Sequence, residues 1–219
     1  MTPRTRGAIV AAYNGSPSSE RALDWAADEA RRRGLPLRVV YAFTWPLHHS
    51  LPRGLPGFDV DEYARRVIDR ARHRALERVP GLEVETERFT AEPEPMLLLE
   101  THTAHTLVVG AGRMKAVDTV LPGSMAMALL VAASCPVVVV PEREPGPVLG
   151  RVMVGVDGSD QAGEALEWAF AEADTREAVL RAVSVYQEGE RRSLRMREHP
   201  GGNGPARSGS PGVDTREAG

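Results

Sequence analysis

The stretch that decides the fold is LVVGAGRMKAVDTVLPGSMAMALLVAASCPVVVV, which runs from Leu107 to Val140. Its first apolar run ends at Gly110, and a loop with further glycines follows. Gly123-Ser124 then open a second apolar segment, and Val137–Val140 close the stretch. We interpret this pattern as strand, loop, helix, strand. The backbone N–H groups of such a loop, together with the helix N-terminus behind it, can bind an anion, most often a phosphate.

The composition is that of a soluble globular protein. Of the 219 residues, 42% are apolar and 26% are charged, so we expect a packed core. The net charge of -3 argues against an electrostatic nucleic-acid binder. No apolar run approaches the roughly 18 residues that a membrane span needs, and the first residues do not resemble a secretory signal. We therefore expect a cytoplasmic protein, in which the single cysteine, Cys135, forms no internal disulfide.

Strands and helices alternate along the chain. Strands are predicted at Ala8–Tyr13, Leu37–Phe43, Leu82–Phe89, Leu107–Val109 and Val137–Val140, and helices at Pro17–Arg33, Asp59–Val79, Pro95–Thr103 and Ser124–Ala133. The Pro-, Gly- and His-rich segment Thr44–Phe58 is predicted to be a loop. Such alternation indicates βαβ units around a parallel sheet, whose ligands bind at the carboxyl ends of the strands. We expect the turn at Asn14 and the loop after Gly110 to face each other across one crevice.

The beginning of the chain is repeated. Residues Ile9–Phe43 align without a gap on Val152–Tyr186, and the identical pairs include Ser16/Ser159 and Trp25/Trp168. We interpret this as an internal duplication. The predicted domains are a complete α/β domain at 1–141, a linker at 142–149, a partial β-α-β second copy at 150–187, and a disordered tail at 188–219 that is rich in Arg, Gly, Pro and Ser.

These motifs resemble those of the universal stress protein family. The resemblance rests on Val-Gly-Val-Asp-Gly-Ser at Val154–Ser159, its weaker counterpart at Ala11–Ser16, Cys-Pro-Val-Val-Val-Val at Cys135–Val140, and the spacing from Gly110 to Gly123-Ser124. It implies a five-stranded parallel sheet sandwiched by helices, Rossmann-like and of the adenine nucleotide alpha hydrolase type. It also implies a protein that is often dimeric or tandem, sometimes binds ATP, and acts as a regulator rather than an enzyme.

The resemblance implies a nucleotide site as well. The ATP-binding pattern of this family is Gly, two residues, Gly, nine residues, then Gly-Ser or Gly-Thr. The second glycine of the pattern corresponds to Arg113 in this chain, and Gly112 lies one residue before that position. The Asp of the first strand is replaced by Asn14, and the base would lie beside Ala42. The implied ATP-binding set is Asn14, Ala42, Gly110, Gly112, Arg113, Gly123, Ser124 and Met125. Mg²⁺ would enter only with ATP, and no catalytic residue or protein metal site is expected.

Several interpretations stay open at this point. The glycines either contact phosphate or only shape the turn, with Ser124 as a helix cap. Asn14 is either a nucleoside contact or a turn residue, and Arg113 either obstructs the phosphates or contacts them. The leading function is a stress-response module regulated by nucleotide. The alternative is a nucleotide-free module that dimerises through the edge strand Val137–Val140. An ATP-hydrolysing enzyme is disfavoured, because the sequence shows no positioned base or carboxylate cluster.

Overall fold

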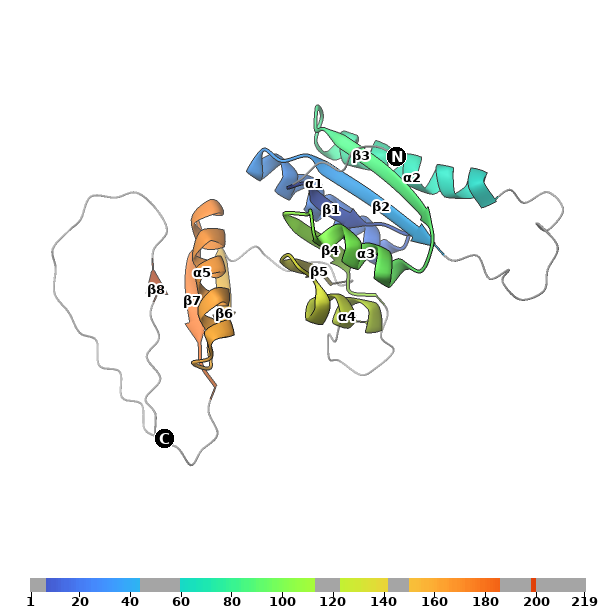
Figure 1. Ribbon diagram of the computed structural model, residues 1–219. Coiled ribbons are helices and arrows are strands. Elements are labelled where there is room, and N and C mark those ends of the chain that lie inside the picture. The colour runs from blue at the N-terminus through green and yellow to red at the C-terminus, as the bar shows by residue number, and fades with distance from the viewer. Residues whose placement is uncertain (1–6, 44–59, 113–122, 142–149, 186–197, 200–219) are drawn as a thin grey trace, which may run out of the picture. The chain divides into compact units, whose positions relative to one another are not determined.

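The structure is a computed structural model that describes residues 7–43, 60–112, 123–141, 150–185 and 198–199 (Figure 1). The chain divides into two compact units, Met1–Pro145 and Gly146–Gly219. None of the helices in the described ranges is long and apolar enough to cross a membrane. The predicted loop at Thr44–Phe58 lies outside the described residues.

A five-stranded sheet forms the centre of the first unit. Its order is β3-β2-β1-β4-β5, and all of its neighbouring strands are parallel. The strands are β1 (Ile9–Ala12), β2 (Leu37–Phe43), β3 (Val84–Thr90), β4 (Thr106–Gly110) and β5 (Val137–Val140), and the helices are α1 (Pro17–Arg33), α2 (Val60–Arg78), α3 (Pro93–Thr101) and α4 (Ser124–Ala132). The predicted parallel α/β fold is confirmed. The largest differences are at β3 and α3, since β3 begins two residues later than predicted and α3 two residues earlier.

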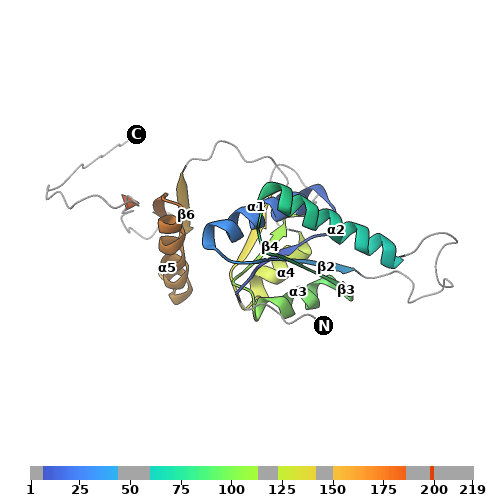
Figure 2. The same ribbon diagram turned by 90° about the horizontal axis from the view of Figure 1, so that it is seen from above.

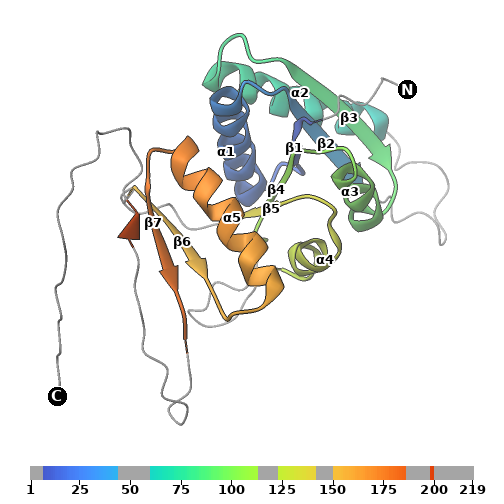
Figure 3. The same ribbon diagram turned by 60° about the vertical axis from the view of Figure 1, so that its left-hand side comes forward.

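The helices cover both faces of this sheet (Figure 2, Figure 3). Alternate residues of the buried strands point to opposite faces, which is why the strands read as continuous apolar runs. On one face Ile9 and Ala11 of β1 pack with α1 and α2. On the other face Val10, Leu107 and Val109 pack with Leu97 of α3 and with the apolar residues of α4. Each face of the sheet therefore has its own hydrophobic core.

Helix α1 has defined ends that the sequence predicts correctly. Ser16 is the N-cap, and its hydroxyl accepts a hydrogen bond from the backbone N–H of Ser19 at 3.3 Å. Pro17 follows in the first turn, where its missing N–H costs nothing. Gly34 ends the helix in the left-handed conformation, with φ of 63°. The start of α1 is thereby fixed directly behind the end of β1.

A cluster of charged residues is buried between β2, β3 and α3. The Arg38 side chain donates hydrogen bonds to Glu100 at 3.1 Å, Glu85 at 3.2 Å and Glu87 at 3.4 Å. Arg38 is only 2% exposed and Glu100 only 1% exposed. Since buried charges are costly unless they are paired, this cluster fixes how α3 lies on β2.

The second unit is described by four elements. Strands β6 (Arg151–Gly155) and β7 (Val179–Val183) are parallel, and α5 (Asp160–Thr175) connects them. Its N-cap, Ser159, accepts a hydrogen bond from the N–H of Ala162 at 3.2 Å, as Ser16 does from Ser19 in α1. A two-residue strand, β8 (Glu198–His199), pairs antiparallel with β7 inside the segment expected to be a disordered tail. The proposed limits of the second copy at 150–187 stay a prediction.

Two matched substitutions compare the buried cluster with a surface ion pair. We expect Arg38→Met to lower the free energy of unfolding by about 3–5 kcal/mol, because it removes the cation that pairs with the buried Glu100 carboxylate. Arg78→Met removes a half-exposed pair with Asp28, which spans 2.6 Å, and should cost less than about 1 kcal/mol. Urea denaturation measures both values. Equal losses would contradict the role given to the cluster.

Candidate functional site

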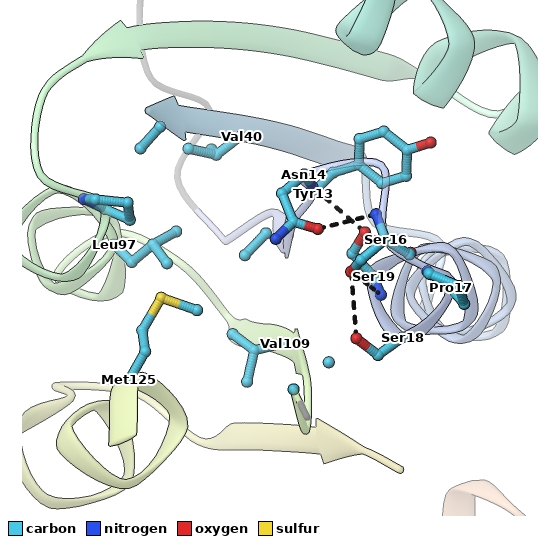
Figure 4. Close-up of a pocket in the computed structure, with 15 residues that line it drawn as sticks. Tyr13, Asn14, Ser16, Pro17, Ser18, Ser19, Val40, Leu97, Val109 and Met125 are labelled. Carbon is cyan, nitrogen blue, oxygen red and sulfur yellow. Dashed lines mark hydrogen bonds between the residues drawn. The ribbon is translucent and has the colours of Figure 1, made fainter. Parts of the chain in front are cut away.

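A pocket of about 470 Å³ opens at the carboxyl ends of β1, β2 and β4 (Figure 4). The strand order reverses between β1 and β4, so the pocket lies at the topological switch point where ligands of open parallel sheets bind. Its lining comes from segments far apart in the sequence: Ala12, Tyr13, Asn14, Ser16, Pro17, Ser18, Ser19, Val40, Ala42, Pro93, Leu97, Val109, Gly110, Gly112 and Met125. The volume is within the range of small-molecule sites.

One side of the pocket, here termed the apolar wall, is made of aliphatic side chains. Its members are Val40 and Ala42 of β2, Pro93 and Leu97 of α3, Val109 of β4, and Met125 of α4. Figure 4 shows Leu97, Met125 and Val109 around the same open space. Such a surface suits a flat apolar ring, because binding removes apolar area from water on both partners.

The opposite side, here termed the polar wall, is the turn that leads from β1 into α1. The Oδ1 atom of Asn14 accepts a hydrogen bond from the backbone N–H of Ser16 at 3.0 Å. The backbone N–H of Asn14 donates to the Ser19 hydroxyl at 3.3 Å, and that hydroxyl donates to the Ser16 carbonyl at 2.9 Å. The hydroxyls of Ser16 and Ser18 are 3.2 Å apart. These bonds hold the turn in one conformation beside the positive end of the α1 dipole.

No residue in the described lining carries a formal charge at neutral pH. The only acidic group there is the Tyr13 phenol, and its hydroxyl points away from the pocket (Figure 4). Burial raises the pKa of Tyr13, with a further contribution from Glu20. The described pocket therefore offers hydrogen-bond donors and an apolar surface, and it holds no group placed for acid or base catalysis.

Gly110 allows the end of β4 to approach α1 closely. A Cβ atom at this position would lie 2.7 Å from the backbone carbon of Ser18 and 2.8 Å from its oxygen. Because backbone atoms cannot move aside as a flexible side chain can, no larger residue fits without displacing the helix. Gly110 thus has a packing role in addition to its place in the pocket.

The glycine-bearing loop is held at its base by backbone hydrogen bonds. The N–H of Gly123 donates to the carbonyl of Ala111 at 2.8 Å, and the N–H of Ala111 donates to the carbonyl of Val140 at 2.8 Å. Gly112 has a φ of 71°, in the left-handed region that favours glycine. Gly123, not Ser124, is the N-cap of α4, and no side chain caps this helix.

The residues proposed from the sequence have different places in the structure. Asn14, Ala42, Gly110, Gly112 and Met125 line the same pocket. Gly123 and Ser124 begin α4 and are not part of its lining. Arg113 lies outside the described residues.

Sequence reasoning missed two parts of the pocket. The serines of the polar wall are not among the site residues predicted from the sequence, although Ser-Pro-Ser-Ser after an Asn-Gly turn places several hydroxyls in one helical turn. Leu97 has no sequence signal beyond helix formation, and Pro93 lies before the predicted helix. The place of both residues depends on how α3 packs on β2.

Comparison with known proteins agrees with this open α/β architecture. A sequence model described as the Universal stress protein family matches residues 5–141 and 149–200. A universal stress protein of Mycobacterium tuberculosis is 32% identical over 209 residues, which is 90% of this chain and 68% of the relative. One from Mycobacterium bovis is 31% identical over 200 residues, 85% of this chain and 66% of the relative. The chain belongs to the universal stress protein family, and it spans about two thirds of the length of these relatives.

Solved structures support the fold. The crystal structure of a universal stress protein from Archaeoglobus fulgidus DSM 4304 is similar at a TM-score of 0.60, with 19% identity, over 85% of this chain and 70% of that chain. A universal stress protein from Archaeoglobus fulgidus in complex with dAMP has a TM-score of 0.45 and 25% identity, over 61% of this chain and 97% of that chain. The first likeness shows the Rossmann-like fold, and the second is too loose to place a ligand in this chain.

Two glycines that end strands provide a test of the close approach at Gly110. Gly110→Ala should lower the free energy of unfolding by about 1–3 kcal/mol, because its Cβ atom meets the backbone of Ser18. Gly155→Ala, at the end of β6, has open space around its Cβ atom and should change stability by no more than about 0.5 kcal/mol. Chemical denaturation of each variant measures the difference, and an unchanged Gly110→Ala protein would refute the packing role.

Proposed function

We propose that this universal stress protein is a regulatory module that binds an adenine nucleotide, ATP in the first instance, in the pocket at the switch point. The observation that carries the proposal is the pairing of an apolar wall with a polar wall inside about 470 Å³. A nucleotide has the same two parts, a flat base and a polar sugar phosphate. The position at the carboxyl ends of β1 and β4 adds independent support.

In the proposed complex the base lies on the apolar wall. Ala42 leaves room there because its side chain is a single methyl group, while Leu97 and Met125 contact the ring from α3 and α4. The phosphates point toward Gly112 and the uncapped start of α4, whose first N–H groups favour an anion. The described residues contain no cluster of three or more His, Cys, Asp or Glu side chains able to hold a metal ion. Mg²⁺ would therefore be bound through the phosphates of ATP.

Regulation would follow from the bonds at the base of the loop. Ala111 lies between two pocket residues, Gly110 and Gly112, and its backbone is bonded both to Gly123 and to Val140 of β5. A nucleotide that binds better to one conformation of the Ala111 backbone would increase the population of that conformation. Because Ala111 is bonded to Val140, the conformation of β5 would change with it. We propose a binding module rather than an enzyme, and the cytoplasmic location expected from the sequence stays a prediction.

Titration with ATP tests the nucleotide site. We expect isothermal titration to give a measurable heat, and ATP to raise the melting temperature, since a ligand that binds only the folded state stabilises it. Ala42→Phe should abolish both effects by filling the place of the base, while circular dichroism confirms an unchanged fold. If millimolar ATP produces no heat and no thermal shift, the proposal is refuted.

A second candidate function is pairing between copies of this chain through β5. Strand β5 is at the edge of the sheet and pairs with β4 alone among the described strands. The neighbouring helix α4 exposes Met127, Leu130 and Val131, the last at 83% of its surface. An edge strand with unpaired backbone groups beside apolar side chains is a template for a further strand.

The hydrogen bonds of β5 allow this pairing to be tested without disturbing β4. The carbonyls of Pro136 and Val140 accept bonds from the β4 side, so the backbone groups of the intervening odd residue Val139 face outward. We expect light scattering to show a dimer in the micromolar range, and Val139→Pro to make it monomeric while the fold is kept. Val138→Pro should instead destabilise the domain, because its N–H faces β4. A wild-type monomer throughout this range would contradict the dimer.

A further inference from the structure

We infer that Asn14 is a specificity-determining residue, which offers the ligand a hydrogen-bond donor and so admits adenine nucleotides whose 2′ or 3′ oxygen carries a phosphate. This inference rests on the proposed function, because it concerns the same pocket. It goes further by naming the chemical class of ligand that Asn14 permits.

The orientation of the Asn14 amide follows from its partner in the turn. The backbone N–H of Ser16 can only donate, so the atom of Asn14 that lies 3.0 Å from it must be the oxygen. The amide nitrogen is then on the other side of the group, and Figure 4 shows it directed toward the open space between Leu97 and Val109. No described residue accepts a hydrogen bond from it. The pocket therefore receives the two N–H donors of Asn14, and its acceptor is used in the turn.

The second unit shows what a carboxylate does in the same turn. Asp157 is the aligned counterpart of Asn14, and its Oδ1 atom accepts from the backbone N–H of Ser159 at 2.9 Å. The turn is thus compatible with either side chain. What changes is the outer atom, which is an N–H donor in Asn14 and a carboxylate oxygen in Asp157. A hydrogen bond from the Ser159 hydroxyl at 2.7 Å, together with the one from its backbone N–H, lowers the pKa of Asp157, so its carboxylate stays charged at neutral pH.

The side-chain atom that is not bonded to the turn determines which ligand groups can bind beside it. A carboxylate accepts hydrogen bonds from sugar hydroxyls and repels a phosphate. An amide N–H can donate to a hydroxyl oxygen or to a phosphate oxygen. With the base on the apolar wall and the 5′-phosphate at Gly112, the sugar lies between them, in front of Asn14. No carboxylate side chain is present in the described lining to repel a second phosphate there.

The experiment compares AMP with two bisphosphates that each carry one further phosphate. The dissociation constants of 5′-AMP and of adenosine 3′,5′-bisphosphate are measured for the wild-type chain and for Asn14→Asp, and the 2′,5′ isomer is measured in parallel. We expect the wild type to bind AMP and at least one bisphosphate with similar affinity. Asn14→Asp should bind AMP but disfavour that bisphosphate by at least about tenfold relative to the wild type, since like charges then meet. This discrimination should weaken as salt is added.

Matched controls separate this effect from a change of fold. Asn14→Asp should keep the melting temperature of the wild type, because Asp157 makes the same turn bond. Asp157→Asn makes the reverse change in the second unit and should leave the ratio of the two dissociation constants unaltered. A ratio that is the same in the wild type and in Asn14→Asp, or a wild type that itself rejects both bisphosphates, overturns the inference. If the wild type binds neither AMP nor ATP, the proposed nucleotide site fails, which is a different result.

Discussion

The close approach of β4 to α1 at Gly110 is the constraint on which the pocket depends. With a Cβ atom excluded by the backbone of Ser18, the last residue of β4 lies directly against the first turn of α1. This contact brings Gly110 and Ser18 together in the lining of the pocket, where the polar and apolar walls face each other. The same contact gives Gly110 a structural reason to be glycine, whether or not it also lies near a phosphate.

The fold could be predicted from the sequence because its signals are strong and local. Apolar runs of strand length alternate with helical patterns, and Ser16 and Gly34 bound α1 by capping chemistry that needs no tertiary information. The predicted start of α3 is two residues late, because Glu92, its N-cap, makes no side-chain hydrogen bond that the pattern could reveal. Where a helix has no capping side chain, its end is set by packing against other elements, and the local sequence does not reveal that packing.

The pocket could be predicted only in part. Its glycines and the β1 turn were visible from a family pattern, whereas Pro93 and Leu97 reach the pocket only because Arg38 and Glu100 fix α3 on β2. The sequence also shows Asn14 without the direction of its amide. That direction depends on the N–H of Ser16, which donates to the amide oxygen and leaves the amide N–H groups for a ligand.

The duplication separates what the turn requires from what a ligand requires. In both copies a serine caps the helix, and a buried glutamate pairs with an arginine four residues later, Glu29 with Arg33 and Glu172 with Arg176. These shared features belong to the βαβ unit itself. The turn side chain differs between the copies, Asn14 against Asp157, although both make the same bond to the backbone. Since the turn accepts either residue, the fold does not require an amide at position 14. The amide can therefore be selected for the ligand that the pocket binds.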